Sequence, residues 1–244
     1  MLQRFAEIPR SISLALALMA AMPAAFTAQH RLGPLASRVL ADFAGVRPSG
    51  FRAMLDRMRK PALSPQERLL VRSALPRHGE LVPSRRQAEK LSPLQQILQY
   101  HRRDGLIEVK LVDTFQVAVG LHARSFILIS APALRLLDSE ELRALAAHEM
   151  GHDYFWDEFR GALDTNNEER EQELELRCDA VAVFTLLDLG LNPRKLLSAL
   201  TTAYALNARF GPALNDKRYV PEQERIRFLQ ALIASVCPAG HPCR

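Results

Sequence analysis

Three residues in the middle of the chain, His148, Glu149 and His152, form the pattern HExxH, here His-Glu-Met-Gly-His. Two histidines four residues apart lie one turn apart on the same face of a helix, so their imidazoles can bind one metal ion. The glutamate between them can reach a water molecule at that ion and act as a general base. In a chain with 7 histidines the pattern arises by accident in about one such chain in a hundred. A third ligand is therefore needed to support the prediction.

Two further candidates, Glu175 and Asp179, lie on a later helical pattern and are again four residues apart. Glu175 can complete a site of two histidines and one glutamate, which leaves a fourth position for water. Asp179 can accept a hydrogen bond from the outward N–H of a ligand histidine and thereby fix the tautomer of that ring. The sequence predicts one zinc ion per chain, held by His148, His152 and Glu175.

These two motifs resemble those of a family of zinc endopeptidases that includes the CAAX prenyl endopeptidase, the heat-shock protease HtpX and soluble periplasmic relatives. Members carry HExxH on one helix and ExxxD on a later one, which correspond here to residues 148–152 and 175–179. The resemblance covers roughly residues 126–232, including the approach to the first motif at residues 136–142. It implies a zincin-type catalytic domain that acts on protein or peptide substrates, with Glu149 as the catalytic residue.

The resemblance also has departures, which concern the substrate groove. In the family a strand before the HExxH helix lines the cleft and pairs with the extended backbone of the substrate. Relatives usually have an Asn-Ala-Phe segment and a glycine pair there, whereas this chain has Gln116–Ala118 and Leu121–Arg124. Tyr219 stands where the family has a histidine, ahead of Arg225 in a Glu-Arg-Ile segment. Tyr219 and Arg225 are candidates for stabilising a transition state; the alternative is a packed tyrosine and a surface arginine.

Helical patterns surround both motifs. Residues 138–147 have apolar side chains at helical spacing, and Asp138 or Ser139 can cap this helix. Gly151 costs about 1 kcal/mol inside a helix, but its missing side chain would let another segment approach closely. Further helices are predicted at residues 94–101, 168–189 and 194–208, with a polar loop at 164–167 and a last helix opening at Pro221.

Three runs rich in β-branched and aromatic residues, at 107–112, 115–119 and 125–130, predict the strands of a small sheet. The sequence thus predicts an α+β fold that is mostly helical, with the sheet packed against the HExxH helix. The aromatic cluster at residues 154–156 is predicted to be core rather than substrate pocket. Cys178, inside the ExxxD motif, is predicted to be a small buried hydrophobe rather than a ligand.

The first 28 residues have a basic start and an apolar run from Ile12 to Met22, which is typical of a secretory signal. An uncleaved anchor or a surface-docked helix also fits this pattern, although the run is short for a span of about 20 residues. The tail, residues 237–244, contains Cys237 and Cys243, which could form a disulfide in an exported protein. We therefore expect an exported protein, either periplasmic or anchored to the membrane by its N-terminal segment.

Residues 29–90 are rich in arginine and proline, with short amphipathic helices predicted at 36–43 and 51–58. This segment could wrap around the catalytic domain or act as a pro-segment, and the sequence leaves both alternatives open. The zinc metallopeptidase domain itself is expected at residues 91–236.

The composition suits one substantial core, since 48% of the 244 residues are hydrophobic. The net charge of +5 hides an asymmetry: residues 138–179 hold fourteen acidic residues and four arginines, a net −10, which leaves +15 elsewhere. The basic remainder could touch an anionic membrane surface. The sequence has no nucleic-acid-binding motif, so no nucleic-acid partner is predicted.

These features predict a zinc-dependent endopeptidase that hydrolyses peptide bonds of envelope or misfolded proteins. The alternative is a proteolytically silent zinc-bearing protein that serves as a chaperone or assembly factor in the envelope. Such a protein has no need of a general base, so the intact Glu149 argues against it.

Overall fold

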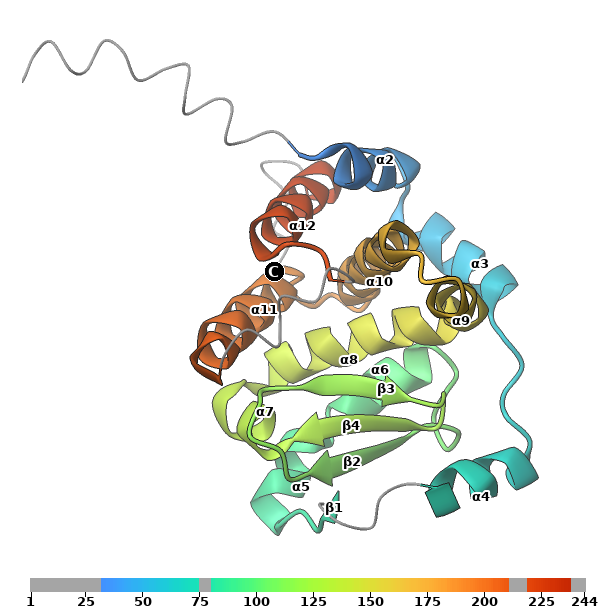
Figure 1. Ribbon diagram of the computed structural model, residues 1–244, viewed down its shortest axis with the longest axis vertical. Coiled ribbons are helices and arrows are strands. Elements are labelled where there is room, and N and C mark those ends of the chain that lie inside the picture. The colour runs from blue at the N-terminus through green and yellow to red at the C-terminus, as the bar shows by residue number, and fades with distance from the viewer. Residues whose placement is uncertain (1–31, 75–79, 211–218, 238–244) are drawn as a thin grey trace, which may run out of the picture.

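The HExxH helix lies between a small sheet and a group of helices (Figure 1). This computed structural model describes residues 32–74, 80–210 and 219–237. Over these residues the chain is mostly helical, with one mixed sheet of four strands in the order β1-β2-β4-β3. The sheet packs against one side of α8 (Ser139–Tyr154), and α10 (Glu168–Asp188) packs against another. The predicted mostly helical α+β class is confirmed.

The middle of the sheet is formed by β2 (Glu108–Val112) and β4 (Phe126–Ser130), which run parallel. The short β1 (Glu80–Leu81) pairs antiparallel with β2. On the other side, β3 (Val119–His122) pairs antiparallel with β4 and forms the edge that contacts α8.

The strand predicted at residues 115–119 is wrong in its position. Pairing with β4 runs from Val119 opposite Ile129 to His122 opposite Phe126, so β3 begins where the predicted strand ends. The aromatic and β-branched residues at 115–119 have a high strand propensity, but cross-strand pairing decides where a strand forms. The other two predicted strands are confirmed as β2 and β4, within a residue of their expected starts.

A capping box fixes the start of α8. The side chain of Asp138 accepts hydrogen bonds from the backbone N–H groups of Glu140 and Glu141, and the Glu141 carboxylate accepts one from the N–H of Asp138. Asp138 rather than Ser139 is therefore the cap. These bonds satisfy backbone donors that a helix start leaves unpaired, which anchors the helix that carries both histidines.

A short helix, α9 (Trp156–Asp164), joins α8 to α10 and has no counterpart among the elements expected from the sequence. Tyr154 and Phe155 before it are buried, as predicted, whereas Trp156 lines the large cleft of the molecule. The predicted polar loop is reduced to residues 165–167. Asn167 ends this loop and caps α10, because its side chain accepts a hydrogen bond from the N–H of Arg170.

Gly151 marks the closest approach of α8 to α10. A Cβ atom placed on this glycine would lie 2.6 Å from the Cα atom of Cys178 and 2.8 Å from its Sγ atom. The predicted close approach is confirmed, and the approaching segment is the ExxxD motif itself. Cys178 is a free and fully buried cysteine, in agreement with the prediction of a small apolar residue.

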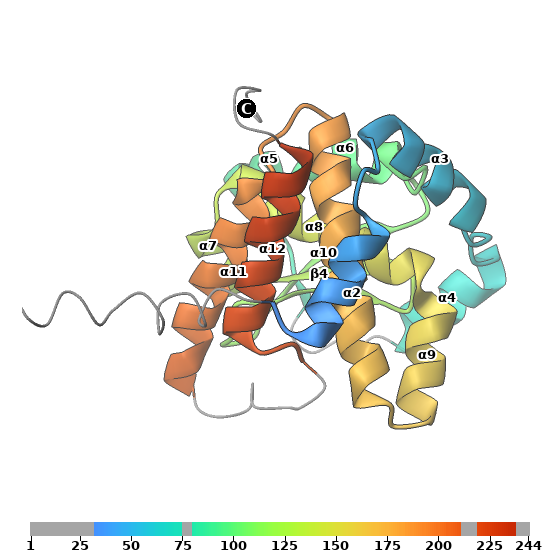
Figure 2. The ribbon, with the colours of Figure 1, turned by 90° about the horizontal axis from the view of Figure 1, so that it is seen from above.

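The N-terminal segment belongs to the same core. The two predicted helices are present as α2 (Pro34–Asp42) and α3 (Pro48–Met58), and α2 lies beside α10 and α12 (Figure 2). The ring of Phe51 is fully buried and stacks on that of Phe184, with 4.4 Å between centroids. This packing favours the alternative in which the segment wraps the domain.

The remaining helices surround this arrangement. They are α4 (Pro65–Ala74), α5 (Arg85–Leu91), α6 (Leu94–Tyr100), α7 (Ala131–Leu136), α11 (Arg194–Asn207), the short 3₁₀ helix η1 (Ala208–Phe210) and α12 (Glu222–Val236). Of these, α6, α11 and α12 were expected from the sequence, whereas α4, α5 and α7 were not.

The predictions for the two ends of the chain fall largely outside the described residues. The expected signal or anchor at residues 1–28 lies there, as does Cys243. Among the described helices, none is both long enough and apolar enough to cross a membrane. Cys237 is disulfide-bonded.

Candidate metal centre

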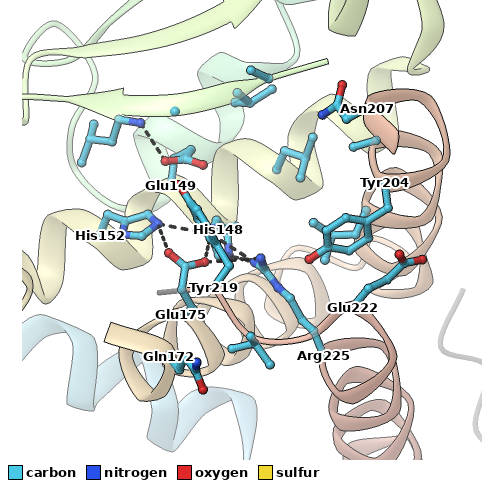
Figure 3. Close-up of a pocket in the computed structure, with 18 of the residues that line it drawn as sticks. His148, Glu149, His152, Gln172, Glu175, Tyr204, Asn207, Tyr219, Glu222 and Arg225 are labelled. Atoms are coloured by element: carbon cyan, nitrogen blue, oxygen red, sulfur yellow. Dashed lines mark hydrogen bonds and ion pairs between the residues drawn. The ribbon is translucent and has the colours of Figure 1, made fainter. Parts of the chain in front are cut away.

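α8 and α10 bring three potential metal ligands together: His148, His152 and Glu175 (Figure 3). The Nε2 atoms of the two histidines lie 3.2 Å apart. Glu175 places Oε2 3.6 Å from Nε2 of His148 and Oε1 3.5 Å from Nε2 of His152. These three side chains form a group that could hold a metal ion, and they are the three that the sequence predicts.

The group is shielded from solvent but has one opening. His148 and Glu175 are buried, while the side chain of His152 keeps 20% of its surface exposed. Burial lowers the pKa of His152, which favours the neutral ring that a metal requires. Burial would raise the pKa of Glu175, but the neighbouring charges of His152, Arg225 and His148 outweigh it and lower that pKa. Glu175 is therefore a carboxylate.

Asp179 fixes the orientation of His148. Its Oδ1 atom lies 2.9 Å from Nδ1 of His148 and accepts the hydrogen bond of that nitrogen. Because Nδ1 carries the proton, Nε2 is left with a lone pair that faces His152 and Glu175. Burial would lower the pKa of His148, but the hydrogen bond to Asp179 and the negative charges of Asp179 and Glu175 together outweigh it and raise the pKa. The predicted relationship between Asp179 and a ligand histidine is present.

Arg225, from α12, clamps the carboxylates of α10. Its Nε and NH2 atoms each donate a hydrogen bond of 2.8 Å to Asp179, and its NH1 atom lies 3.3 Å from Oε2 of Glu175. Arg225 is buried, so the alternative of a surface arginine is wrong. Burial would raise the pKa of Asp179, but the Arg225 guanidinium and His148 lower it. This arrangement places a fixed positive charge behind the ligands.

Glu149 points away from α10 and toward the sheet (Figure 3). Its Oε2 atom accepts a hydrogen bond of 2.7 Å from the backbone N–H of Leu121 in β3. The carboxylate is therefore held beside the candidate metal ligands by the edge strand. A buried carboxylate in this position can take a proton from a water molecule in the cleft.

His148, Glu149, His152, Glu175 and Arg225 line a cleft of about 1380 Å³, whereas Asp179 is buried behind them. One wall is β3 with the segment before it, and the other walls come from α9, α11 and the start of α12. Trp156, Phe159 and Leu163 of α9 lie on one side, and Leu200, Ala203 and Tyr204 of α11 lie on another. The cleft is open and larger than the pockets of about 300–1,000 Å³ that usually bind small molecules.

Tyr219 lines this cleft and is half exposed. It lies with Arg225 on the side of the site contributed by the C-terminal part of the chain (Figure 3). The structure thus brings both candidates for transition-state stabilisation to the cleft, although Arg225 also acts as the partner of Asp179.

Tyr204 and Asn207 of α11 were not found by the sequence analysis. Burial raises the pKa of Tyr204, and the positive charge of Arg225 opposes this rise. Asn207 is bonded to the backbone of Val117, ninety positions earlier in the chain. Their partners are distant in sequence, and no motif spacing signals such contacts.

Comparison with protein-family models gives no match for this chain, and comparison with curated proteins gives no similar sequence. The family resemblance of the two motifs stays a prediction. The geometry of the site therefore supports its function without help from a relative.

Proposed function

We propose that this protein is a zinc-dependent endopeptidase with a zincin-type catalytic domain. The observation that carries the proposal is the spacing of the three candidate ligands. Ligand atoms about 2.0–2.2 Å from a tetrahedral zinc ion lie about 3.4 Å from one another. The two Nε2 atoms here lie 3.2 Å apart, and the Glu175 carboxylate approaches them to 3.6 and 3.5 Å, each through a different oxygen. One ligand atom from each of the three side chains lies within 4.8 Å of the other two. Two imidazoles and one carboxylate also leave a fourth position for water, as catalytic zinc sites do.

A zinc ion bound by His148, His152 and Glu175 would polarise the scissile carbonyl and lower the pKa of the attacking water. Glu149 takes the proton of that water on its carboxylate and passes it to the nitrogen of the leaving amine. The hydrogen bond from Leu121 keeps this carboxylate at the edge strand while it does so. Asp179 maintains the tautomer of His148, and Arg225 holds Asp179 in place.

The cleft favours an extended polypeptide as the substrate. β3 is an edge strand that lines the cleft next to Glu149, and edge strands bind peptides through backbone hydrogen bonds. Such pairing does not depend on side-chain identity, whereas the apolar side chains of α9 and α11 can select for apolar residues. Unfolded proteins expose both their backbone and their apolar side chains, so misfolded proteins are the proposed substrate class.

The decisive experiment compares wild type with Glu149→Gln for zinc content and for cleavage of casein. Wild type should contain about one zinc per chain and degrade casein. Glu149→Gln should keep the zinc and the fold but lose cleavage, because only the general base is removed. Zinc-free wild-type protein prepared without chelators would refute the proposal.

A matched control is Glu173→Gln. Glu173 lies on α10, where it pairs with Arg170 and Arg177 away from the ligands, so this variant should cleave casein at the wild-type rate. If wild type and Glu149→Gln are both inert toward proteins yet complement a gene deletion equally, the silent chaperone is the better account.

We also propose that the protein works in an oxidising compartment. Cys237 is disulfide-bonded, and such bonds persist outside the cytosol. Freshly isolated protein should therefore resist alkylation at Cys237 until it is reduced. A freely reactive thiol at this position would contradict export.

A further inference from the structure

The edge formed by β3 and the two residues before it has three residues whose backbone groups can face the cleft: Val117, Val119 and Leu121. In an antiparallel pair, successive residues direct their N–H and C=O groups alternately toward the partner strand and away from it. The C=O of Ala118 accepts a hydrogen bond from the N–H of Ser130, so Ala118 faces β4. The backbone groups of Val117, Val119 and Leu121 therefore face away from β4, and all three residues line the cleft.

Two of these positions are already occupied. The N–H of Val117 donates to Oδ1 of Asn207 at 2.8 Å, and Nδ2 of Asn207 donates to the C=O of Val117 at 2.9 Å. The N–H of Leu121 donates to Glu149. Within the part of the chain that the structure describes, no hydrogen bond reaches the outward groups of Val119.

The side-chain amide of Asn207 thus imitates a residue of a paired strand. It offers one acceptor and one donor to Val117, as the backbone of a neighbouring strand would. Asn207 is buried at the end of α11, on the side of the cleft opposite His152 (Figure 3). A second backbone cannot pair with Val117 while this amide is in place.

We propose that Asn207 determines where the substrate-binding edge of β3 ends, so that a substrate pairs fully with one residue, Val119. This inference rests on the proposed function, in which the substrate backbone adds to β3. A substrate chain antiparallel to β3 runs from Leu121 toward Val117, so its C-terminal part meets Asn207. Asn207 therefore ends backbone pairing toward the C-terminal part of the bound peptide.

The proposal specifies which backbone groups of a bound peptide take part. The residue opposite Val119, here called the paired residue, exchanges two hydrogen bonds with it. The residue two positions earlier donates one hydrogen bond to the C=O of Leu121, because the N–H of Leu121 belongs to Glu149. The residue two positions later would face Val117 and forms no backbone hydrogen bond, because Asn207 holds both groups of Val117.

This pattern can be measured by scanning a peptide with N-methyl groups. The Glu149→Gln protein binds peptides without cleaving them, and fluorescence anisotropy selects the tightest binder among overlapping 15-residue peptides of casein. Each amide of that peptide is then methylated in turn. Methylation at the paired residue should lower the affinity of the peptide by about three- to tenfold, which is the effect of one hydrogen bond. Methylation at the residue two positions earlier should have the same effect. Methylation at the residue two positions later should lower the affinity by less than about twofold.

Asn207→Ala provides the comparison that separates this role from a merely structural one. Without the amide, the N–H and C=O of Val117 are free to pair with the substrate, so methylation of the residue two positions later should now lower the affinity by about three- to tenfold. A variant that is simply less folded would weaken every peptide by the same factor and leave the methylation pattern unchanged, which would overturn the proposal. Asn207→Asp keeps the acceptor for Val117 and should give an intermediate pattern.

In the protein that keeps Asn207, a loss of affinity on methylation of the residue two positions later would also overturn the proposal. A failure of every casein peptide to bind would do the same. These results are independent of catalysis. If casein is not cleaved but the methylation pattern holds, the proposed protease activity fails and the role of Asn207 stands. If casein is cleaved and the pattern is absent, the role of Asn207 fails alone.

Discussion

The Nδ1 atom of His148 lies 2.9 Å from Oδ1 of Asp179, whose side chain has no exposed surface. Because this hydrogen bond sets the tautomer of a ligand histidine, its loss should weaken metal binding without abolishing it. Asp179→Asn should release zinc to a competing chelator sooner than wild type, with a loss of affinity of about 10–100-fold. Glu175→Gln should lose more, since it removes a ligand.

Glu173→Gln is the control for this competition. Its side chain lies on the same helix but pairs with Arg170 and Arg177, so zinc retention should stay at the wild-type level. Loss of zinc from Glu173→Gln with retention in Glu175→Gln would show that the wrong carboxylate has been chosen.

The ligand set could be predicted because its parts are local in sequence. His148 and His152 share a helix face by their spacing, and Glu175 and Asp179 do so for the same reason. Helical periodicity therefore predicts which side chains lie on the same face of a helix, without any knowledge of tertiary contacts. Periodicity does not predict which face of α10 packs against α8. The structure places that contact at Gly151 and Cys178.

The parts of the site that escaped prediction depend on distant contacts. Arg225 reaches Asp179 from α12, and Asn207 reaches Val117 from α11, and neither pair has a spacing that signals it. The prediction of secondary structure was wrong where one residue type is compatible with two local structures. α4 begins at Pro65, a residue that suits the first position of a helix as well as a break between helices.

Arg225 should matter most when no metal is bound. Arg225→Gln leaves Asp179 and Glu175 as buried carboxylates without their guanidinium partner, which should cost about 3–5 kcal/mol of unfolding free energy in the presence of chelator. Added zinc should narrow this loss, because the ion supplies a positive charge next to Glu175. Urea denaturation with and without zinc measures both quantities.

Two comparisons test the cause of this loss. Arg86→Gln, at an exposed position of α5, should change stability by less than about 0.5 kcal/mol, because substitutions at exposed positions usually have small effects. The double variant Asp179→Asn/Arg225→Gln should lose less unfolding free energy than the two single variants lose in total, because the two side chains interact directly. Full additivity would mean that Arg225 does not stabilise Asp179.

His101 should make stability fall in acid. The ring is buried, with Nδ1 3.0 Å from the Tyr154 hydroxyl and Nε2 3.2 Å from the Thr185 hydroxyl. Burial and nearby arginines lower its pKa from 6.5 to about 3. Between about pH 3 and pH 6.5, His101 is protonated in the unfolded chain but neutral in the folded protein. Stability from this group is thus complete above pH 6.5 and falls by about 1.4 kcal/mol per pH unit below it.

The variant His101→Gln isolates this effect because it cannot titrate. It should be less stable than wild type at pH 7.5, and the difference in unfolding free energy should shrink by about 2–3 kcal/mol on going to pH 4.5. Urea denaturation in chelator measures both proteins, and the other titrating groups cancel in the comparison. Parallel pH curves for the two proteins would show that His101 has the same pKa in the folded protein as in the unfolded chain.

Gly151→Ala should separate the two helices that carry the ligands. The new Cβ atom would lie 2.6 Å from the Cα atom of Cys178, and a backbone atom cannot move aside as the end of a side chain can. We expect a net loss of about 1–3 kcal/mol in unfolding free energy, despite the higher helix propensity of alanine. Because α8 carries both histidines and α10 carries Glu175, zinc retention should fall as well.

Gly161→Ala is the matched control for this change. Gly161 lies inside α9, and a Cβ atom there would have no heavy atom within 4 Å beyond its own helix and chain neighbours. This variant should be as stable as wild type or more stable by up to about 1 kcal/mol, with unchanged zinc retention. Adding Cys178→Ala to Gly151→Ala should restore little, because the clash with the Cα atom remains. If Gly151→Ala is as stable as wild type and keeps its zinc, the contact between α8 and α10 does not set the geometry of the site.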